Sequence, residues 1–487
     1  MKKYHNNRKL KSSHLIAGFL AFVLVATSCE SLLEEEPKTI VSENFYQSRS
    51  DFEAATNAIY FPLRMVRSEQ IAVLSAHTDW GYGRGSRAQY NDFEGLNPTN
   101  ANAAAARWNS FYQGIRNANI VIEKAPQSDL LTAEEMNAFS AEAKFLRALT
   151  YFDLVRNWGG VPLRTDQNIK EKDVPKSSPE EVYELILADL SEAEMYLPTA
   201  PSEPGRPTLW AAKTLLADVY LQLQNYEMAK SKAQEVIDAA AFQLVKIASV
   251  DEIRAKIFGA ALISSTEEIF AFKFARQTGQ GSGLPWILNH PSTKLYNFGG
   301  AYAHYGDARN PFYKEWEDGD LRKGLWQMVN FGLGDSTLVN GKYAESQAVD
   351  NTGAGNDIPI YRYSELLLIY AEASVRTEGL TESNLEAFNQ VRRRAYGLDP
   401  MAASEMDYVL ADLSVESFLD LILQEKAYET QFEGKRWLDL KRTGRAQEFV
   451  MKNKGITIAD KHYLWPIPID ELNFNDAMDQ SDQNPGY

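Results

Sequence analysis

Apolar residues recur every three to four positions over most of the chain, which is the spacing of amphipathic helices. Within one such stretch, Ala141, Phe145, Ala148 and Phe152 fall on a single helical face. The same spacing predicts helices over Ser50–Met65, Ala103–Lys124, Thr132–Asn157, Ser177–Leu197, Thr208–Gln224, Tyr226–Ala239, Tyr361–Glu378, Ser383–Tyr396 and Ser414–Phe432. The pattern therefore predicts a mainly α-helical protein.

The helices over 208–239 form a predicted hairpin of a recognisable kind. Large residues (Leu216, Tyr220) and small ones (Ala217, Ala229, Ala233) occupy the positions they hold in a tetratricopeptide repeat. The pair over 361–396 is similar, and the pair over 103–157 matches less well. Several degenerate helical hairpins in one chain predict an α-α superhelix as the scaffold.

The stretch from Phe242 to about Gly355 has a different pattern. It is rich in Gly, Asn, Tyr and Trp, has few periodic runs, and contains one possible strand at 270–274. Long irregular stretches inside compact domains are usually functional or disordered, and this many aromatic residues argue against disorder. We therefore predict an ordered, loop-rich, partly β subdomain on the helical scaffold.

The first residues read as an export signal. Five basic residues and no acidic one precede an apolar run from Leu15 to Ala26, which predicts a signal peptide over 1–28. The run is too short to span a bilayer of about 30 Å. Small residues directly before the only cysteine, Cys29, resemble the lipobox of bacterial lipoproteins, in which that thiol is acylated. The alternative is an ordinary signal peptide followed by a chance cysteine; a secreted thiol without a disulfide partner favours lipidation at Cys29.

Charge narrows the classes of partner. The chain has 50 Lys+Arg against 66 Asp+Glu, and loss of the basic leader leaves the remainder still more acidic. Such a surface disfavours nucleic acid as a partner and also adsorption to anionic lipid. Residues 29–44 read as an acidic tether that self-repels and extends. Membrane attachment is therefore assigned to the lipid on Cys29.

Aromatic residues in two loop regions are the candidate ligand contacts. A pyranose ring has an apolar face that flat side chains can cover, and stacking adds roughly 1 kcal/mol beyond burial, by analogy with aromatic pairs. The alternative is that each ring only packs its own loop. The candidates are Trp80, Tyr82 and Arg84 in a glycine-punctuated loop whose aromatics look exposed, and Trp286, Tyr296, Tyr302 and Tyr305 in the irregular stretch.

Motifs spread over the whole chain resemble those of the SusD/RagB family of outer-membrane lipoproteins. Each motif is weak alone, but their shared order is specific. They are the lipobox at Cys29, Leu146-Arg147-Ala148 with Tyr151 and Trp158-Gly-Gly-Val-Pro-Leu163, the 208–239 hairpin, Arg362-Tyr363-Ser364-Glu365-Leu366, Arg436-Trp437-Leu438-Asp439-Leu440-Lys441-Arg442, Leu464-Trp465-Pro466-Ile467-Pro468 and Gln483-Asn484-Pro485-Gly486-Tyr487. The resemblance implies a SusD-like helical region over 45–254, a variable ligand-binding insertion over 255–345 and a SusD/RagB-like region over 346–487.

The resemblance also implies a function without catalysis. Such a protein is lipid-anchored at the outer face of the outer membrane, binds oligosaccharide or polysaccharide, and delivers it to a SusC-like TonB-dependent transporter. The loops that hold Trp80 and Trp286 are where the family places ligand contacts. Two alternatives stay open: the same fold binding peptide or another nutrient, and a helical-repeat scaffold that binds no ligand.

Other chemistry finds little support in the sequence. The six histidines lack metal-ligand spacing, so no metal or other cofactor is predicted. Acidic residues between Glu315 and Asp320 show no calcium-loop pattern, and neither Gly81–Ser86 nor Gly332–Gly334 is a phosphate loop. A lipid-anchored glycosidase is a further hypothesis for those acids, but no spacing favours it. The charged motif 436–442 is predicted to tie the C-terminal segment to the core by fork-shaped hydrogen bonds.

Overall fold

A computed structural model describes residues 45–93 and 102–487. Contacts divide the chain into two units, residues 1–51 and 52–487, and the architecture below is that of the second. The predicted signal peptide, Cys29 and the acidic tether lie outside the described residues. Within the described residues, no helix combines the length and apolar character needed to cross a membrane.

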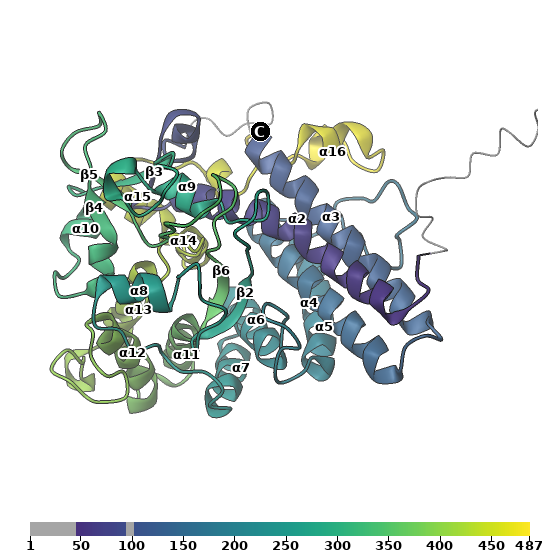
Figure 1. The fold of residues 1–487 in the computed structure, drawn as a ribbon, viewed down its shortest axis with the longest axis horizontal. Coiled ribbons are helices and arrows are strands. Elements are labelled where there is room, and N and C mark those ends of the chain that lie inside the picture. The colour runs from purple at the N-terminus through teal and green to yellow at the C-terminus, as the bar shows by residue number, and fades with distance from the viewer. Residues whose placement is uncertain (1–44, 94–101) are drawn as a thin grey trace, which may run out of the picture. The chain divides into compact units, whose positions relative to one another are not determined.

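The first half of the chain is built from long helices that pack against their neighbours in sequence (Figure 1). Contacts join α3 to α4, α4 to α5, α5 to α6 and α6 to α7. The helices are α2 (Arg49–Ala76), α3 (Asn102–Lys124), α4 (Ala133–Trp158), α5 (Pro179–Tyr196), α6 (Leu209–Gln222) and α7 (Tyr226–Asp238). Capping boxes at Thr132 and Ser178 begin α4 and α5, so these two helices start where local sequence places them.

Helix α2 is longer than its sequence predicts. We expected it to end at Met65, but it continues to Ala76 with Pro62 inside it. Beyond Met65 its buried residues are mostly small or polar, among them Ser68, Gln70 and Ser75. Tertiary burial on several sides therefore sustains a segment that has no amphipathic pattern of its own.

The second half returns to helices around α11 (Tyr363–Glu378). This helix packs against α7 of the first half and against α12 (Glu382–Ala395) and α13 (Val415–Glu429), so it closes the scaffold. The remaining helices are α14 (Arg436–Arg442), α15 (Ala446–Lys454) and α16 (Ile469–Phe474). The helical hairpins that spacing predicted over 208–239 and 361–396 are therefore present.

Between the two halves lies the loop-rich subdomain, which holds short strands and single-turn helices. One antiparallel sheet has the strand order β1-β3-β5-β4, and a second pairs β2 with β6. Its elements, with β1 from the loop after α2, are β1 (Tyr82–Gly83), β2 (Glu268–Phe272), β3 (His304–Asp307), β4 (Trp326–Met328), β5 (Thr337–Asn340), β6 (Ile358–Arg362), α8 (Val250–Lys256), α9 (Leu284–Leu288) and α10 (Pro311–Lys314). Only β2 was expected from sequence.

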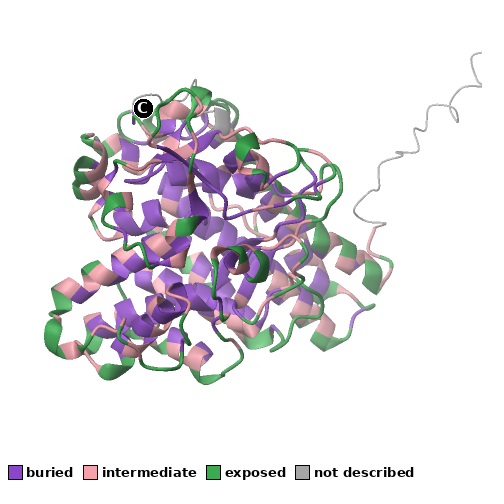
Figure 2. Cartoon of the chain, turned by 60° about the vertical axis from the view of Figure 1, so that its left-hand side comes forward, coloured by how far each residue is buried: buried purple, intermediate pink, exposed green. Residues whose placement is uncertain are grey.

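The irregular subdomain packs into a hydrophobic cluster that it shares with α2 and α13, which accounts for its order without long elements. Figure 2 shows buried residues running through the loops as well as the helices. Leu284, Phe312, Trp316 and Leu338 are almost fully buried in one cluster that also takes in Phe432 from the segment after α13. The fold class is therefore as predicted: a mainly α, tetratricopeptide-like scaffold with a partly β, loop-rich subdomain.

Candidate ligand-binding site

Strands β1 and β3 bring the two predicted loop regions together. Tyr82 pairs with Tyr305 and Gly83 with His304 in antiparallel register. The rings of Tyr82 and Tyr305 stack with their centroids 5.4 Å apart and their planes 20° from parallel. Two residues that are more than two hundred positions apart in sequence thus come together in one aromatic surface.

Arg84 extends this surface across to Tyr302. Its backbone N–H donates to the Ala303 carbonyl at 2.9 Å, and its Nη2 donates to the Ala301 carbonyl at 3.0 Å. These bonds hold the guanidinium carbon 4.0 Å from the centre of the Tyr302 ring. The exposed arginine is therefore fixed in place by a cation–π contact and by backbone acceptors.

Tyr302 occupies a backbone conformation that L-residues rarely adopt, with φ at +39°. Gly299 and Gly300 before it also have positive φ, at +77° and +93°. The backbone N–H of Tyr302 donates to the Asn289 carbonyl at 3.1 Å, which helps hold this turn. Strained residues of this kind concentrate at functional sites, where the surrounding structure over-determines them.

Two further rings complete the surface, and sequence analysis did not select either. The Phe331 ring lies 5.0 Å from Tyr302 and 6.0 Å from Tyr305. The His290 ring lies 4.6 Å from Tyr302 and stacks on Phe331 at 5.7 Å. Phe331 precedes Gly332 and Gly334, which the sequence offers only as a rejected phosphate loop. An aromatic residue beside this glycine turn was the signal that could have identified Phe331 as a candidate ligand contact. The aromatic cluster, as named below, consists of Tyr82, Arg84, His290, Tyr302, Tyr305 and Phe331.

Trp80 does not belong to this surface. The glycine-punctuated loop predicts an exposed ring here, but the Trp80 side chain is 3% exposed. Its ring stacks on Phe312 at 5.7 Å and meets Trp326 and Phe432 edge-on. The expectation of an exposed tryptophan was wrong because neighbouring elements cover the ring, and in this position Trp80 supports the loop from below.

Trp286 and Tyr296 lie in a separate small cluster with Ala348 and Ala354. Tyr296 is buried, its hydroxyl donates to the Asp350 carbonyl at 3.1 Å, and burial raises its pKa to about 12. Trp286 is partly exposed, and its carbonyl accepts from Ala301 N–H at 2.6 Å. The structure therefore brings together Tyr82, Arg84, Tyr302 and Tyr305 from the predicted set, and not these two.

The aromatic cluster presents hydrogen-bond donors beside flat rings. Burial lowers the pKa of His290, and so does the nearby Arg84, so the ring is neutral at pH 7. Its Nδ1 accepts from the Ser292 N–H at 3.2 Å, which leaves the proton on Nε2. Burial raises the pKa of the Tyr82 and Tyr305 hydroxyls, which stay protonated. This arrangement suits a ligand with an apolar face and a hydroxyl-rich rim.

The acidic residues between 315 and 320 are engaged in ion pairs. Glu315 pairs with Lys452 at 2.8 Å, Glu317 with Arg392 at 3.0 Å and Asp320 with Arg322 at 2.6 Å. Across residues 45–93 and 102–487, no group of three or more His, Cys, Asp or Glu is placed to hold a metal ion. These carboxylates are therefore occupied by basic side chains of the same chain.

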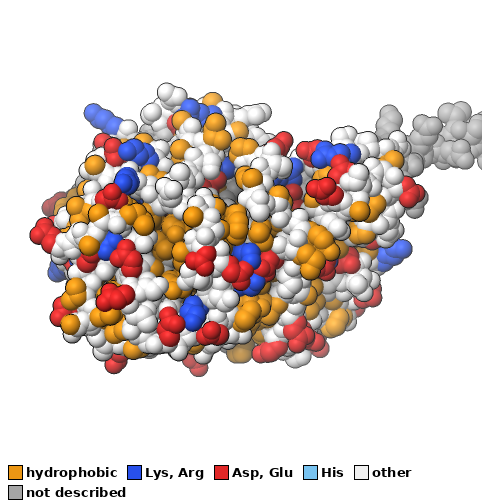
Figure 3. Space-filling model, turned by 90° about the horizontal axis from the view of Figure 1, so that it is seen from below, with side chains coloured by type: hydrophobic (Ala, Val, Ile, Leu, Met, Phe, Trp, Pro, Cys, Tyr) orange, Lys and Arg blue, Asp and Glu red, His pale blue; other side chains and the backbone are white. Residues whose placement is uncertain are grey.

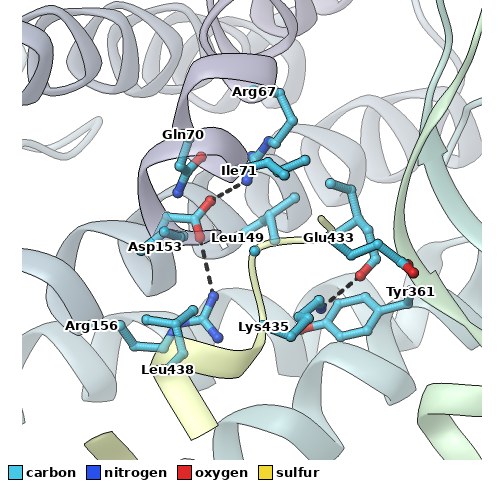
Figure 4. Close-up of a pocket in the computed structure, with 13 residues that line it drawn as sticks. Arg67, Gln70, Ile71, Leu149, Asp153, Arg156, Tyr361, Glu433, Lys435 and Leu438 are labelled. Carbon is cyan, nitrogen blue, oxygen red and sulfur yellow. Dashed lines mark hydrogen bonds and ion pairs between the residues drawn. The ribbon is translucent and has the colours of Figure 1, made fainter. Parts of the chain in front are cut away.

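A small, partly open pocket is lined by residues of α2, α4, β6 and the segment that leads into α14 (Figure 4). It encloses about 30 Å³, the room of one or two water molecules, and is too small for a sugar ring. Asp153 accepts from Arg67 at 2.7 Å and from Arg156 at 3.1 Å on its wall. Gln70, which is 1% exposed, faces this cavity with no hydrogen-bond partner for its amide among the described residues. The pocket is therefore a region of buried polar contacts between elements of the scaffold.

Three of the motifs that carried the family resemblance, 158–163, 464–468 and 483–487, meet in space although they are far apart in sequence. Trp158 Nε1 donates to the Pro466 carbonyl at 3.1 Å, and its ring meets Trp465 edge-on at 4.8 Å. The Asn484 amide donates to the Trp158 and Trp465 carbonyls at 2.8 and 2.7 Å. These three motifs therefore contact one another and hold the C-terminal segment against the end of α4.

The fold and the aromatic cluster define a class of protein: a tetratricopeptide-like helical scaffold that presents an aromatic surface built on its loops. Two family profiles match the chain. One, described as SusD family, matches residues 295–487, and another, described as starch-binding associating with outer membrane, matches residues 33–221. With the relatives below, these matches show that the chain belongs to the SusD/RagB family.

Curated relatives extend over nearly the whole chain. SusD-like protein P38 of Formosa agariphila is 28% identical over 536 residues, covering 97% of this chain and 99% of its own length. A SusD-like protein of Bacteroides ovatus is 28% identical over 286 residues, covering 57% of this chain and 50% of its own length.

Solved structures share the fold. A SusD homolog from Bacteroides thetaiotaomicron has a TM-score of 0.79 at 22% identity, with 93% of this chain and 100% of that chain covered. A laminarin binding SusD-like protein has a TM-score of 0.76 at 24% identity, with 91% and 100% covered. Surface glycan-binding protein A from Bacteroides thetaiotaomicron in complex with laminarihexaose has a TM-score of 0.72 at 21% identity, with 88% and 98% covered.

Proposed function

We propose that this protein is a lipid-anchored glycan-binding protein of the outer-membrane surface. It captures oligosaccharide or polysaccharide on the aromatic cluster and passes it to a SusC-like TonB-dependent transporter. It performs no catalysis of its own. Cys29 carries the lipid, and the folded part carries the ligand surface.

The aromatic cluster is the observation that carries this proposal. Flat rings in a partly exposed, fixed arrangement match the C–H face of a pyranose, and Arg84 with His290 supplies donors for its hydroxyls. The strained backbone at Tyr302 holds one of these rings before any ligand arrives, which lowers the entropy cost of binding. Because the surface spans several rings, it suits more than one sugar unit.

The comparisons add support of a second kind. Relatives of the same fold are described as binding laminarin or laminarihexaose, which are glucose polymers. The family profile over the N-terminal half is described as associating with the outer membrane. Uptake of a captured glycan across the outer membrane would need a transporting partner, and this is the role we assign to the SusC-like transporter.

Isothermal titration calorimetry against a panel of polysaccharides, with laminarin included, tests the proposal. We expect at least one glycan to bind and the Tyr302→Ala and Tyr305→Ala variants to weaken it by about fivefold or more, as expected for a lost stacking contact of about 1 kcal/mol. Tyr196→Ala is the matched control, because Tyr196 is an exposed tyrosine (42%) at the end of α5, outside the cluster. Its affinity should equal that of the unmodified protein.

Three outcomes would each overturn a part of the assignment. Binding that survives both cluster substitutions would move the site elsewhere on the protein. Silence across the glycan panel, with binding of peptides in a parallel panel, would replace glycan by peptide as the ligand while leaving the fold and the anchor untouched. New reducing ends after incubation with oligosaccharides would contradict the absence of catalysis.

A further inference from the structure

We propose that Asn310 is a positioning residue that holds the Tyr82 ring in its stacked position on Tyr305. Asn310 is in turn anchored, through Asp79, to Arg436 of the charged motif 436–442. The inference goes beyond the proposed function because it assigns ligand-site roles to residues outside the aromatic cluster. The binding measurement that tests it rests on the proposed function, whereas the hydrogen–deuterium exchange measurement does not.

The first link joins the charged motif 436–442 to the loop that leads into β1. Arg436, at the start of α14, donates from Nε and Nη2 to the two carboxylate oxygens of Asp79, both at 2.9 Å. Arg436 is 3% and Asp79 0% exposed, so this fork is shielded from solvent. Asp79 lies three residues before Tyr82. The motif is therefore bonded to the loop that carries the first ring of the cluster.

The second link is a single amide that touches three elements. The two hydrogens of Asn310 Nδ2 are shared among three acceptors: the Asp79 carbonyl at 3.0 Å, the Asn453 carbonyl at 3.1 Å and the Tyr82 hydroxyl at 3.3 Å. Asn453 in turn donates from its own amide to Asp79 Oδ2 at 2.8 Å. Asn310 is 5% exposed, so these bonds compete little with water. Its position fixes the outer end of the Tyr82 ring relative to α15.

A third contact holds the inner side of the same ring. Lys454 donates from Nζ to the Ala76 carbonyl at 3.1 Å and also to the Gly81 carbonyl. The same ammonium nitrogen lies 4.6 Å from the centre of the Tyr82 ring. The Tyr82 ring is thus held by the Asn310 amide at its hydroxyl, by the Lys454 amine over the ring and by stacking on Tyr305.

Asn310 also has an ordinary structural task, and the test must separate the two. Its Oδ1 accepts from the Phe312 N–H at 2.8 Å and so caps α10. Asn310→Ser keeps a good capping oxygen while removing the amide that reaches Asp79, Asn453 and Tyr82. A loss caused only by the missing cap would therefore not appear in this variant.

Hydrogen–deuterium exchange on the full chain gives the ligand-free readout. We expect the backbone amides of residues 77–84 to exchange faster in Asn310→Ser than in the unmodified protein, with α10 unchanged. Asn225→Ala is the matched control, because Asn225 caps α7 from outside the site. It should leave the exchange of residues 77–84 unchanged. Equal exchange of that segment in all three proteins would overturn the proposal.

A double-mutant cycle with laminarin, or with whichever glycan the panel identifies, gives the binding readout. Asn310→Ser should weaken affinity about three- to tenfold, the range for one or two lost hydrogen bonds. In a Tyr82→Ala background the same substitution should change affinity less than twofold, because its effect passes through that ring. An undiminished effect in that background would contradict the positioning role. If no glycan binds at all, the proposed function fails, and the exchange experiment still decides the role of Asn310.

Discussion

The side chains of Trp80 and Tyr302 show how burial, rather than residue type, separates core from site. Both are aromatic residues in glycine-containing loops, and both were candidates for the same role. Trp80 is covered by Phe312, Trp326 and Phe432, whereas Tyr302 stays partly exposed beneath Arg84. Glycine-rich context predicts a loop, but only the packed neighbours decide which ring faces solvent.

His304 gives a pH dependence that can be measured. It is 1% exposed on β3, and burial lowers its pKa from 6.5 to about 3. Below pH 6.5 the unfolded chain binds a proton there that the folded chain does not, so stability is lost as the pH falls. The slope is up to about 1.4 kcal/mol per pH unit for this one group.

We expect His304→Phe to reduce the slope of the unfolding free energy between pH 6.5 and pH 4.5, measured by urea denaturation at several pH values. Val339→Ala on the neighbouring strand β5 is the control, since it removes buried volume and no titrating group. It should lower stability by a similar amount at every pH. A His304→Phe slope equal to that of the unmodified protein would show that this histidine does not titrate as described.

At the scale of elements, α2 shows how a helix tolerates an internal proline. Pro62 has no N–H, so the carbonyl of Ala58, four residues earlier, loses its usual helical donor. The Asn117 amide of α3 donates to that carbonyl at 2.8 Å. The bond that local sequence removes is thus replaced by a neighbouring helix, which is one reason the helix extends past its predicted end.

Asn117→Ala should therefore destabilise the protein by about 1 kcal/mol, and by distinctly less in a Pro62→Ala background, where residue 62 can donate to Ala58 itself. Denaturant unfolding of the two single variants and the double variant measures the coupling. Gln113→Ala, at an exposed position on the same helix, should have little effect. Additive effects of the two substitutions on the unfolding free energy would show that the Asn117 amide does not replace the donor that Pro62 denies to the Ala58 carbonyl.

Arg362 joins the loop-rich subdomain to the scaffold. At the end of β6 it donates to Glu267 and Glu429 at 2.7 Å and to Glu433 at 2.7 and 2.9 Å. All four side chains are buried. The arginine and lysine partners of Glu429 and Glu433 hold the pKa of both carboxyls below the usual value despite burial. These ion pairs link β2 and β6 to the C-terminal end of α13.

Arg362→Met should cost about 3–5 kcal/mol of unfolding free energy, because three buried carboxylates then share one buried cation fewer. Urea denaturation near pH 7 checks this value. Lys172→Met, which breaks a solvent-exposed pair with Asp476 at 3.5 Å, should change stability by less than about 1 kcal/mol. Similar small effects for both substitutions would show that the buried network adds nothing to stability.

At the scale of the whole molecule, acidic surface and lipid attachment have complementary roles. Acidic side chains are spread over the face drawn in Figure 3, between hydrophobic and basic ones. With 66 acidic against 50 basic residues, charge gives the protein no means of adhering to an anionic membrane. Attachment therefore falls to Cys29 in our proposal.

Cys29→Ala should release the protein from membranes while leaving glycan affinity and unfolding free energy unchanged. Fractionation of cells that lack the transporter, followed by detection of the protein in soluble and membrane fractions, measures the effect. The unmodified protein in the same cells is the control and should sediment with the outer membrane. A variant that still sediments there would contradict lipidation at Cys29.

The sequence by itself determined the fold class, most helix boundaries and the family. Helical spacing, capping residues such as Thr132 and Ser178, and the ordered motifs are local signals, and local signals are sufficient where helices are long. It also selected four members of the aromatic cluster, Tyr82, Arg84, Tyr302 and Tyr305, because aromatics in glycine-containing loops are visible without a structure.

Only the tertiary structure decided which candidates share one surface. Strands β1 and β3, with two and four residues, carry too little pattern to be read from sequence, so their pairing could not be foreseen. That pairing places Tyr82 on Tyr305, admits His290 and Phe331, and leaves Trp80 in the core. The physical reason is that burial and contact between distant segments depend on packing, which no single stretch of sequence contains.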